Sequence, residues 1–364
     1  MNPQAIRRLD AWLGKPICFA LTALRRLALV APRRPPSETP LRKILLIKMI
    51  EQGATVLAYR AIARAVELVG QENVYFLTFD DNRFILDLLD LIPRENVLTV
   101  RSRGPLALMW DLLRAPWQAR NIGIDASVDM EFFSRASAIL GFLSGARRRV
   151  GLHRFTSEGP YRGDLLTHRV QYNPYLHTAA AYLLLVEALL ADPRQVPLVK
   201  APVPAIDFAP PRFRPTTEDV ERVQEMLDAA AGRRVSRPIV LLNPNASDLL
   251  PLRRWPTDRF VELGRRILEG HPWTTVAVTG APSEREACEQ VARRIGSHTI
   301  NLAGRTTLRD LIVLYTMADV LVTNDSGPAH FATLTPVEVV VLLISIWVVY
   351  PILMVIVGKV YKLV

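Results

Sequence analysis

The chain has 364 residues, which is too many for a single core of ordinary size and enough for two domains. Hydrophobic residues make up 50% of the sequence and charged residues 22%, which excludes an intrinsically disordered chain. The formal net charge of +10 favours an anionic partner, but no basic helix is interleaved with aromatic residues, so nucleic acid is not expected. Two distant cysteines, Cys18 and Cys288, argue against a disulfide framework or a cysteine zinc site, and favour the cytoplasm.

The first expected element is a basic amphipathic helix over Ile6 to Val30. Its apolar residues recur at spacings of three and four: Leu9, Leu13, Ile17, Leu21, Leu24 and Ala28. The apolar run from Ile17 to Leu24 is shorter than the about 20 residues that span a bilayer. Such a helix can lie on an anionic membrane surface. The alternatives are an uncleaved signal-like segment and a helix docked on its own protein. A tether from Arg33 to Pro40 completes this segment, 1–40.

The rest of the chain divides into two halves, 41–200 and 216–343, separated by a proline-rich linker at 201–215. Each half alternates strands with helices. The expected strands are Lys43–Lys48, Val74–Leu77, Val97–Val100, Asn121–Asp125, Ile239–Asn243, Thr275–Val278, Asp319–Thr323 and Val337–Leu343, and the expected helices are Thr55–Leu68, Phe84–Leu91, Thr178–Leu190, Arg259–Leu268, Glu284–Ile295 and Leu308–Met317. This alternation predicts an α/β protein with two Rossmann-like domains facing a cleft. Ligands of such sheets bind at the carboxyl ends of the strands.

Polar side chains follow two expected strands of the second half. Asn243 and Asn245 end the first of these strands, and Arg254 precedes the next helix. Amide and guanidinium groups suit a diphosphate. Glu284 follows the next strand, where a carboxylate can accept hydrogen bonds from ribose hydroxyls or complement the dipole of the helix that it begins.

The stretch Asn324–His330 lies between an expected buried strand and an expected helix. A glycine-containing turn at the start of a helix presents backbone N–H groups and a positive dipole end to a phosphate. The candidate ligand-binding residues are Asn324, Asp325, Ser326, Gly327 and His330. The alternative is a structural turn in which Asp325 or Ser326 caps the helix. Convergence of several polar loops on one sheet edge favours the ligand site.

Four stretches resemble glycosyltransferase family 9, the heptosyltransferases of lipopolysaccharide core assembly: Arg254-Trp255-Pro256, Gly280, Asn301–Gly304 and Asn324–His330. The resemblance covers Lys43 to about Leu342 and implies a GT-B fold, an ADP-heptose-like donor in the C-terminal domain and a glycolipid acceptor in the N-terminal domain. It further implies inverting transfer without a metal or cofactor, by a cytoplasmic protein peripherally associated with the inner membrane.

The same resemblance implies roles for individual residues. Arg254 stands where the family commonly has a lysine and would bind the donor diphosphate. Glu284 would hold the ribose. The loop from Asp325 to Gly327, with His330, would hold the phosphate and the sugar.

The first strand-to-helix loop departs from the family pattern. Family members usually carry Gly-Asp there, and this aspartate is the expected general base. The present sequence has Gly53-Ala54, and alanine cannot accept a proton. We hypothesise that Glu51, in the same loop, is the base; Asp125 and Asp129 are the alternatives. A catalytically inactive relative that binds nucleotide sugar or protein partners is the competing hypothesis.

Asp129, Arg147 and Arg148 are the expected acceptor contacts. The two arginines belong to Gly145–Gly151, which resembles the loop that closes the first domain of the family. There they would meet acceptor phosphates; the alternative for such a charge run is a solvated surface.

The end of the chain also departs from the family. Residues Ile344 to Val357 continue apolar where the family would turn into further helices, so 344–364 forms an atypical tail. We expect an altered or truncated end, with an incomplete C-terminal domain, in preference to a membrane anchor, because a single span would place the terminal lysines opposite the cytoplasmic side.

Overall fold

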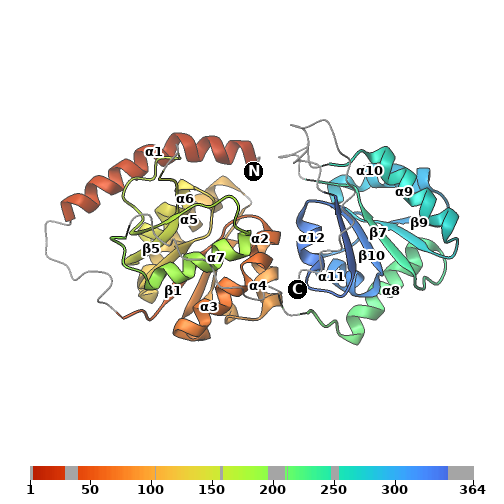
Figure 1. Cartoon of the computed structure of the whole chain (residues 1–364), viewed down its shortest axis with the longest axis horizontal. Helices are drawn as coiled ribbons and strands as arrows, with labels where there is room; N and C mark the ends of the chain where they lie inside the picture. Colours follow the sequence, from red (N-terminus) through yellow and green to blue (C-terminus); the bar gives the residue numbers. More distant parts are fainter. Residues whose placement is uncertain are drawn as a thin grey trace. The chain divides into compact units, whose positions relative to one another are not determined.

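The structure, a computed structural model, describes residues 3–28, 40–102, 104–155, 159–195, 210, 212–246 and 254–342. The chain divides into two compact units, Met1–Phe208 and Ala209–Val364, each with one parallel sheet (Figure 1). Most of the expected tether, most of the expected linker at 201–215 and the tail at 344–364 lie outside the described residues.

The first unit contains a six-stranded sheet with the strand order β3-β2-β1-β4-β5-β6. Its strands are β1 (Ile44–Ile47), β2 (Val74–Phe79), β3 (Val97–Val100), β4 (Ala126–Asp129), β5 (Arg148–His153) and β6 (His168–Gln171). Its α-helices are α1 (Pro3–Ala28), α2 (Gln52–Leu57), α3 (Tyr59–Val69), α4 (Arg83–Leu89), α5 (Pro105–Ile122), α6 (Arg135–Leu143) and α7 (Thr178–Glu187). All four side chains of the central β1 are buried, because helices cover both faces of a parallel sheet.

The helices of the first unit form two layers. α3 and α7 pack together, and α6 contacts both α5 and α1. The crossovers through α5 and α6 run along the sheet in the opposite direction to the crossover through α3. Because such crossovers are right-handed, α5 and α6 cover the face opposite to α3. α1 therefore joins the layer of α5 and α6 (Figure 1).

α1 is the expected N-terminal helix, and the structure shows it docked on its own protein. Cys18 is buried against Ala138 and Leu165, with Leu21 packed beside them. Asp10 accepts hydrogen bonds from the backbone and the guanidinium of Arg135. Of the expected stripe, Leu21 packs on the protein, whereas Leu13, Ile17 and Leu24 are exposed. Among the described residues, no helix combines the length and apolar character needed to cross a bilayer.

Two local expectations in the first unit are wrong. Asn121–Asp125 is not a strand: α5 continues to Ile122, Gly123 ends it with a φ of 79°, and the strand begins at Ala126. A left-handed residue at this position is the common way to end a helix. Gly145–Gly151 is not a closing loop, because most of it belongs to the buried strand β5. Thr55–Leu68 is helical but divided into α2 and α3.

The second unit contains a five-stranded parallel sheet with the order β11-β10-β7-β8-β9. Its strands are β7 (Ile239–Asn243), β8 (Thr275–Val278), β9 (Thr299–Asn301), β10 (Val320–Asn324) and β11 (Glu338–Leu342). Its α-helices are α8 (Thr217–Ala231), α9 (Thr257–Gly270), α10 (Arg285–Ile295), α11 (Leu308–Met317) and α12 (Gly327–Ala332). The expected ranges of β7, β8 and α11 are confirmed. Two parallel sheets covered by helices confirm the α/β class.

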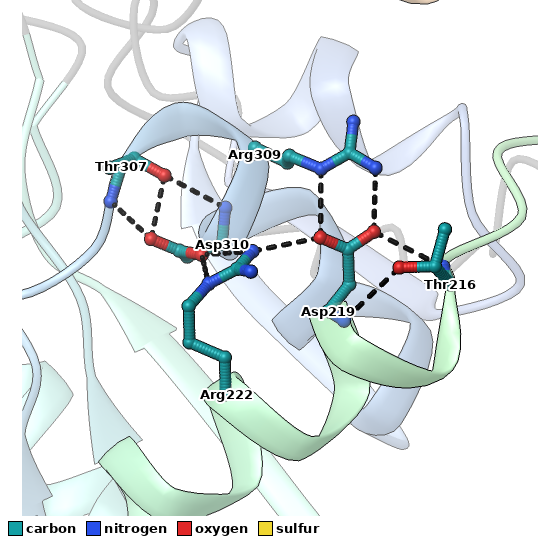
Figure 2. Close-up of polar contacts among 6 residues, drawn as sticks. All are labelled: Thr216, Asp219, Arg222, Thr307, Arg309 and Asp310. Atoms are coloured by element: carbon teal, nitrogen blue, oxygen red, sulfur yellow. Dashed lines mark hydrogen bonds and ion pairs between the residues drawn. The ribbon is translucent and has the colours of Figure 1, made fainter.

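A charged network joins the first turns of α8 and α11. The side chain of Asp219 accepts two hydrogen bonds from Arg309, at 2.8 and 2.6 Å, and one from Arg222, at 2.8 Å. Each helix begins with a threonine capping box, and Figure 2 shows the complete set: Thr216, Asp219, Arg222, Thr307, Arg309 and Asp310. The Arg309 guanidinium holds the pKa of Asp219 well below its usual range. The network therefore fixes the two helix ends against each other.

Replacing Asp219 with alanine is expected to destabilise the second unit by about 2–3 kcal/mol, because the ion pairs of a buried carboxylate and its half of the α8 capping box are lost together. Hydrogen exchange of the α8 and α11 amides measures the loss. The matched control is Asp258→Ala: Asp258 pairs with Arg294 at 2.7 Å, but its side chain is 79% exposed, so we expect about 0.5 kcal/mol or less. Equal effects in both variants contradict the prediction.

The contribution of Asp219 to the stability of the second unit depends on pH. Because the folded-state pKa of Asp219 is depressed, its contribution to stability is present above the unfolded-state pKa of about 3.9 and is lost as the pH falls below that value.

Candidate functional site at the carboxyl ends of the strands

In the second unit, the carboxyl ends of β8, β7 and β10 lie next to one another. β7 pairs in parallel with both β8 and β10. Because parallel strands end at the same edge, the loops that follow Asn243, Val278 and Asn324 begin side by side. The structure thus brings the expected donor-binding loops to one sheet edge.

Asn324 connects these loops. Its side chain is fully buried, and Nδ2 donates to the carbonyls of Pro244 and Asn245 at 3.0 and 3.2 Å. Its Oδ1 accepts from the backbone N–H of Trp255 at 2.9 Å. One amide side chain therefore holds the loop after β7 and the start of α9 against the end of β10.

Asn243 and Asn245 bind the loop after β8. Asn243 Nδ2 donates to Thr279 Oγ1 at 3.2 Å, and Asn245 Nδ2 donates to the Thr279 carbonyl at 3.3 Å. A Cβ atom at Gly280 would lie 2.6 Å from Asn245 Nδ2, so a side chain there would displace the Asn245 amide from its contact with Thr279. The loops therefore form one hydrogen-bonded frame.

The remaining donor candidates surround this frame. Arg254 is exposed and donates to the Ala246 carbonyl at 2.7 Å. Asp325, Ser326 and Gly327 follow Asn324 directly, and all three are half-buried. Ser326 Oγ donates to the Asn324 carbonyl at 3.1 Å, and Ser326 does not cap α12 through its side chain. His330 is half-buried within α12.

Glu284 lies at the start of a helix, where the alternative to ribose binding placed it, and its side chain contacts the backbone there. Its Oε2 accepts from the backbone N–H of Ala281 at 2.7 Å. This contact fixes the carboxylate next to the loop after β8, on the same edge as Asn245 and Gly280.

In the first unit, Glu51 lies in the loop at the carboxyl end of β1. Its side chain is 65% exposed, and Oε2 lies 3.7 Å from the buried Nζ of Lys48. Its backbone has a φ of 70°, a strained conformation for a residue with a side chain. The buried Glu131 binds Lys48 Nζ at 3.1 Å and accepts from the N–H groups of Met49 and Ile50. Glu131 therefore fixes the loop that carries Glu51.

Asp129 ends β4, the neighbour of β1, and is buried. Its Oδ1 accepts from the backbone N–H of Glu131 at 3.0 Å, whereas Oδ2 has no hydrogen-bond partner. The nearest cation is Arg162, whose Nη1 lies 3.9 Å from Oδ2 and also lacks a hydrogen bond. Burial raises the pKa of Asp129 to about 7.

The variant Asp129→Asn tests this shifted pKa. Because the folded-state pKa lies above the unfolded-state pKa, the wild-type protein loses stability as the pH rises from about 4 through 7, by up to about 4 kcal/mol. The variant lacks this loss, so its stability relative to wild type is expected to grow from pH 4 to pH 8. Urea unfolding at several pH values measures the difference, and parallel pH profiles contradict the prediction.

The structure does not bring Arg147 and Arg148 to this edge. Arg148 begins β5 and donates to the Leu189 carbonyl, and Arg147 precedes it, so both lie at the amino-terminal edge of the sheet. Asp125 lies there too: its Oδ2 accepts from the backbone N–H groups of Arg42 and Lys43, at 3.1 and 3.0 Å. Asp125 thus has a structural contact far from Glu51.

A basic cavity at the carboxyl edge of the first unit was not expected from the sequence. It has a volume of about 300 Å³, and its lining includes four arginines, Arg26, Arg154, Arg162 and Arg169, together with Asp164 and with His153, whose pKa is lowered by burial. Asp164 pairs with Arg26 and Arg169. The sequence offers no periodic signal for this cavity, because these residues come from α1, β5, β6 and a loop.

Two Rossmann-like units, each with polar side chains at the carboxyl ends of its strands, define a class of α/β proteins that bind ligands at these edges. A family model described as glycosyltransferase family 9 (heptosyltransferase) matches residues 125–342. The chain belongs to this family.

Relatives with curated names agree with this assignment. Lipopolysaccharide heptosyltransferase 2 of Salmonella typhimurium is 27% identical over 157 residues, which are 42% of this chain and 43% of the relative. Lipooligosaccharide heptosyltransferase 2 of Campylobacter jejuni is 29% identical over 108 residues, 29% of this chain and 33% of the relative. The chain thus matches less than half the length of these relatives.

The fold also matches solved structures. The glycosyl transferase family 9 structure from Veillonella parvula superposes with a TM-score of 0.66, at 16% identity, over 84% of this chain and 82% of that one. The Escherichia coli ADP-heptose lps heptosyltransferase II gives 0.61 at 18% identity, over 82% and 84% of the two chains. This likeness shows a shared two-domain fold.

Proposed function

We propose that the protein is a glycosyltransferase that moves a heptose-like sugar from a nucleotide-sugar donor to a glycolipid acceptor of the lipopolysaccharide type. Membership of family 9 supports the class of reaction, and the names of the relatives support the sugar and the acceptor. The observation that carries the proposal is the buried Asn324, which joins the polar loops of the second unit into one ligand-binding edge.

The donor occupies the second unit. Arg254 binds the diphosphate, because a guanidinium group matches phosphate oxygens. Asn243 and Asn245, whose Nδ2 groups donate to Thr279, position the loops around the diphosphate. Glu284 accepts from the ribose hydroxyls through the carboxylate edge that the Ala281 contact leaves open. Asp325, Ser326, Gly327 and His330 hold the phosphate and the sugar. The donor is of the ADP-heptose kind.

The acceptor occupies the first unit. Asp129 and Arg162 present buried polar atoms without hydrogen-bond partners, which a polar ligand group can satisfy. The basic cavity beside them suits an acidic group of the glycolipid. Arg147 and Arg148, at the other edge, are not part of this proposed acceptor site.

The reaction is a direct displacement with inversion and without a metal. Glu51 takes the proton from an acceptor hydroxyl, whose oxygen forms a bond to the anomeric carbon. The bond from that carbon to the diphosphate oxygen breaks, and the nucleoside diphosphate leaves with the electron pair. Arg254 and His330 stabilise its charge. Lys48, fixed by Glu131, lies 3.7 Å from Glu51 on the same loop.

We place the protein on the cytoplasmic side, peripherally bound to the anionic surface of the inner membrane. α1 supports this placement: Trp12, Phe19 and Leu27 are between 67% and 81% exposed, although the opposite side of the helix is docked. Tryptophan and aliphatic side chains on a basic helix bind a bilayer surface.

The second candidate function is nucleotide-sugar binding without catalysis. Ala54 favours it, since the family usually has an aspartate at that position. Both candidates include donor binding and differ only in transfer.

One experiment tests the proposal and separates the candidates. The full chain is screened by thermal shift against nucleotide sugars that include ADP-heptose, and then assayed for transfer of labelled heptose to a deglycosylated lipopolysaccharide. Thermal stabilisation with transfer supports the enzyme, because ligand affinity raises stability directly. Stabilisation without transfer favours the second candidate. Absence of stabilisation by every nucleotide sugar overturns both.

A further inference from the structure

α5 has an inverted distribution of side chains. Its fully buried residues are small or polar: Asp111, Ala115, Pro116 and Ala119. Five of its large apolar residues are exposed, with fractions between 57% and 85%: Leu106, Met109, Trp110, Leu113 and Trp117. An exposed stripe of this size is unusual for a surface that meets only water.

The exposed residues form one continuous face of the helix. Leu106, Trp110, Leu113 and Trp117 are separated by four, three and four residues, the spacing that aligns side chains along an α-helix. The inward contacts of α5 do not require this stripe, because Leu108, Leu112 and Ile122 pack on the core. The outward face is therefore available to a partner.

Arginine side chains lie within the stripe and near one end of α5. Arg114 is exposed within it, and a cavity of about 360 Å³ near the C-terminal end of α5 is lined by Arg42, Arg120 and Arg147. Among the described residues, these three arginines form no ion pair. Asp125 is the acidic residue in the lining, and its Oδ2 is already occupied by the N–H groups of Arg42 and Lys43.

We infer that the outward face of α5, with the arginine cavity at its end, is a second membrane-docking surface that binds anionic phospholipid. Tryptophan and leucine enter the boundary between headgroups and acyl chains, and the arginines bind the phosphates. The inference rests on the proposed peripheral membrane association and deepens it, since α1 belongs to the same helix layer and exposes Trp12 and Phe19.

Charge favours lipid over a second copy of the chain. A two-fold dimer would place each stripe, with its arginines, against the same surface of the partner. Like charges brought together in this way oppose association. An anionic bilayer satisfies the apolar stripe and the cations together.

The test uses the full chain and vesicles without donor or acceptor. Flotation is compared on phosphatidylcholine vesicles and on vesicles of phosphatidylcholine with phosphatidylglycerol. The double variant Trp110→Ser/Trp117→Ser is expected to reduce partitioning onto the anionic vesicles at least about tenfold. Arg42→Glu/Arg120→Glu is expected to remove the preference for anionic lipid.

Trp273→Ser is the matched control, because Trp273 is 67% exposed and belongs to the second unit. It is expected to bind vesicles like wild type. Because Trp110 and Trp117 are 63% and 64% exposed, their variant is expected to fold normally, which a thermal unfolding scan checks. Its transfer to a detergent-dispersed acceptor is expected to be unchanged, which separates a failure of docking from a failure of the proposed reaction.

Several results overturn the inference. They are unchanged vesicle binding of the α5 variant, absence of binding by the wild type, and loss of all binding when only Trp12 and Phe19 are changed. A concentration-dependent dimer in light scattering that disappears in the α5 variant, with vesicle binding intact, assigns the stripe to self-association instead.

Discussion

Replacing Glu51 with glutamine is expected to slow sugar transfer by about 10²–10⁴-fold, the contribution of a positioned general base. Glutamine keeps the shape of the side chain but cannot take a proton from the acceptor hydroxyl. Donor affinity is expected to remain unchanged, because Glu51 belongs to the first unit and the donor frame to the second. Transfer kinetics and a nucleotide-sugar binding titration measure the two quantities.

Glu67→Gln is the matched control. Its side chain is 54% exposed and lies 3.0 Å from Arg64, so it is an exposed glutamate beside a cation, as Glu51 is, but it lies along α3. We expect wild-type transfer and a stability change within about 0.5 kcal/mol. Wild-type turnover by Glu51→Gln would contradict the assignment of Glu51 as the general base.

A rescue variant sharpens this experiment. Ala54 is the third residue of α2, in the first turn, where a carboxylate is favoured by the helix dipole. The double variant Glu51→Gln/Ala54→Asp is therefore expected to recover transfer, because the carboxylate returns to the position usual in the family. If neither wild type nor the Ala54→Asp variant transfers sugar while both bind donor, the non-catalytic candidate is supported.

The second large effect is expected from Asn324→Ala. The change removes three hydrogen bonds and leaves the Pro244 and Asn245 carbonyls and the Trp255 N–H without their partner. The second unit is expected to lose about 2–4 kcal/mol of stability. Donor affinity is expected to fall about 10–100-fold, because the loops of the donor site lose their common anchor.

Asn96→Ala separates lost stability from lost binding. Asn96 is also a buried amide that joins backbone segments, through the carbonyls of Glu72 and Val74, but it lies in the first unit before β3. This control is expected to destabilise the first unit and to leave donor binding unchanged. Donor affinity is measured well below the unfolding temperature of each variant. Equal affinity in Asn324→Ala and wild type contradicts the role of Asn324.

The sequence by itself determined the elements whose signals are local. β3, β7, β8 and α11 have the expected bounds, because a short apolar run or a regular helical spacing is contained in a few neighbouring residues. The polar stretch after β10 was recognisable for the same reason. Parallel pairing then requires the ends of such strands to share an edge, so the donor loops could be placed together before their contacts were known.

Only the tertiary structure decided which side of each element is buried and which side chains meet. The buried side of α1 depends on α6, more than a hundred residues away. The apolar stripe of α5 is exposed because other residues of the same helix pack on the core. Lys48 and Glu131 are 83 positions apart, and no local pattern indicates their contact. Arg147 and Arg148 lie at the amino-terminal edge because β5 begins at Arg148. Such features depend on burial and partners distant in sequence, and therefore on the assembled fold.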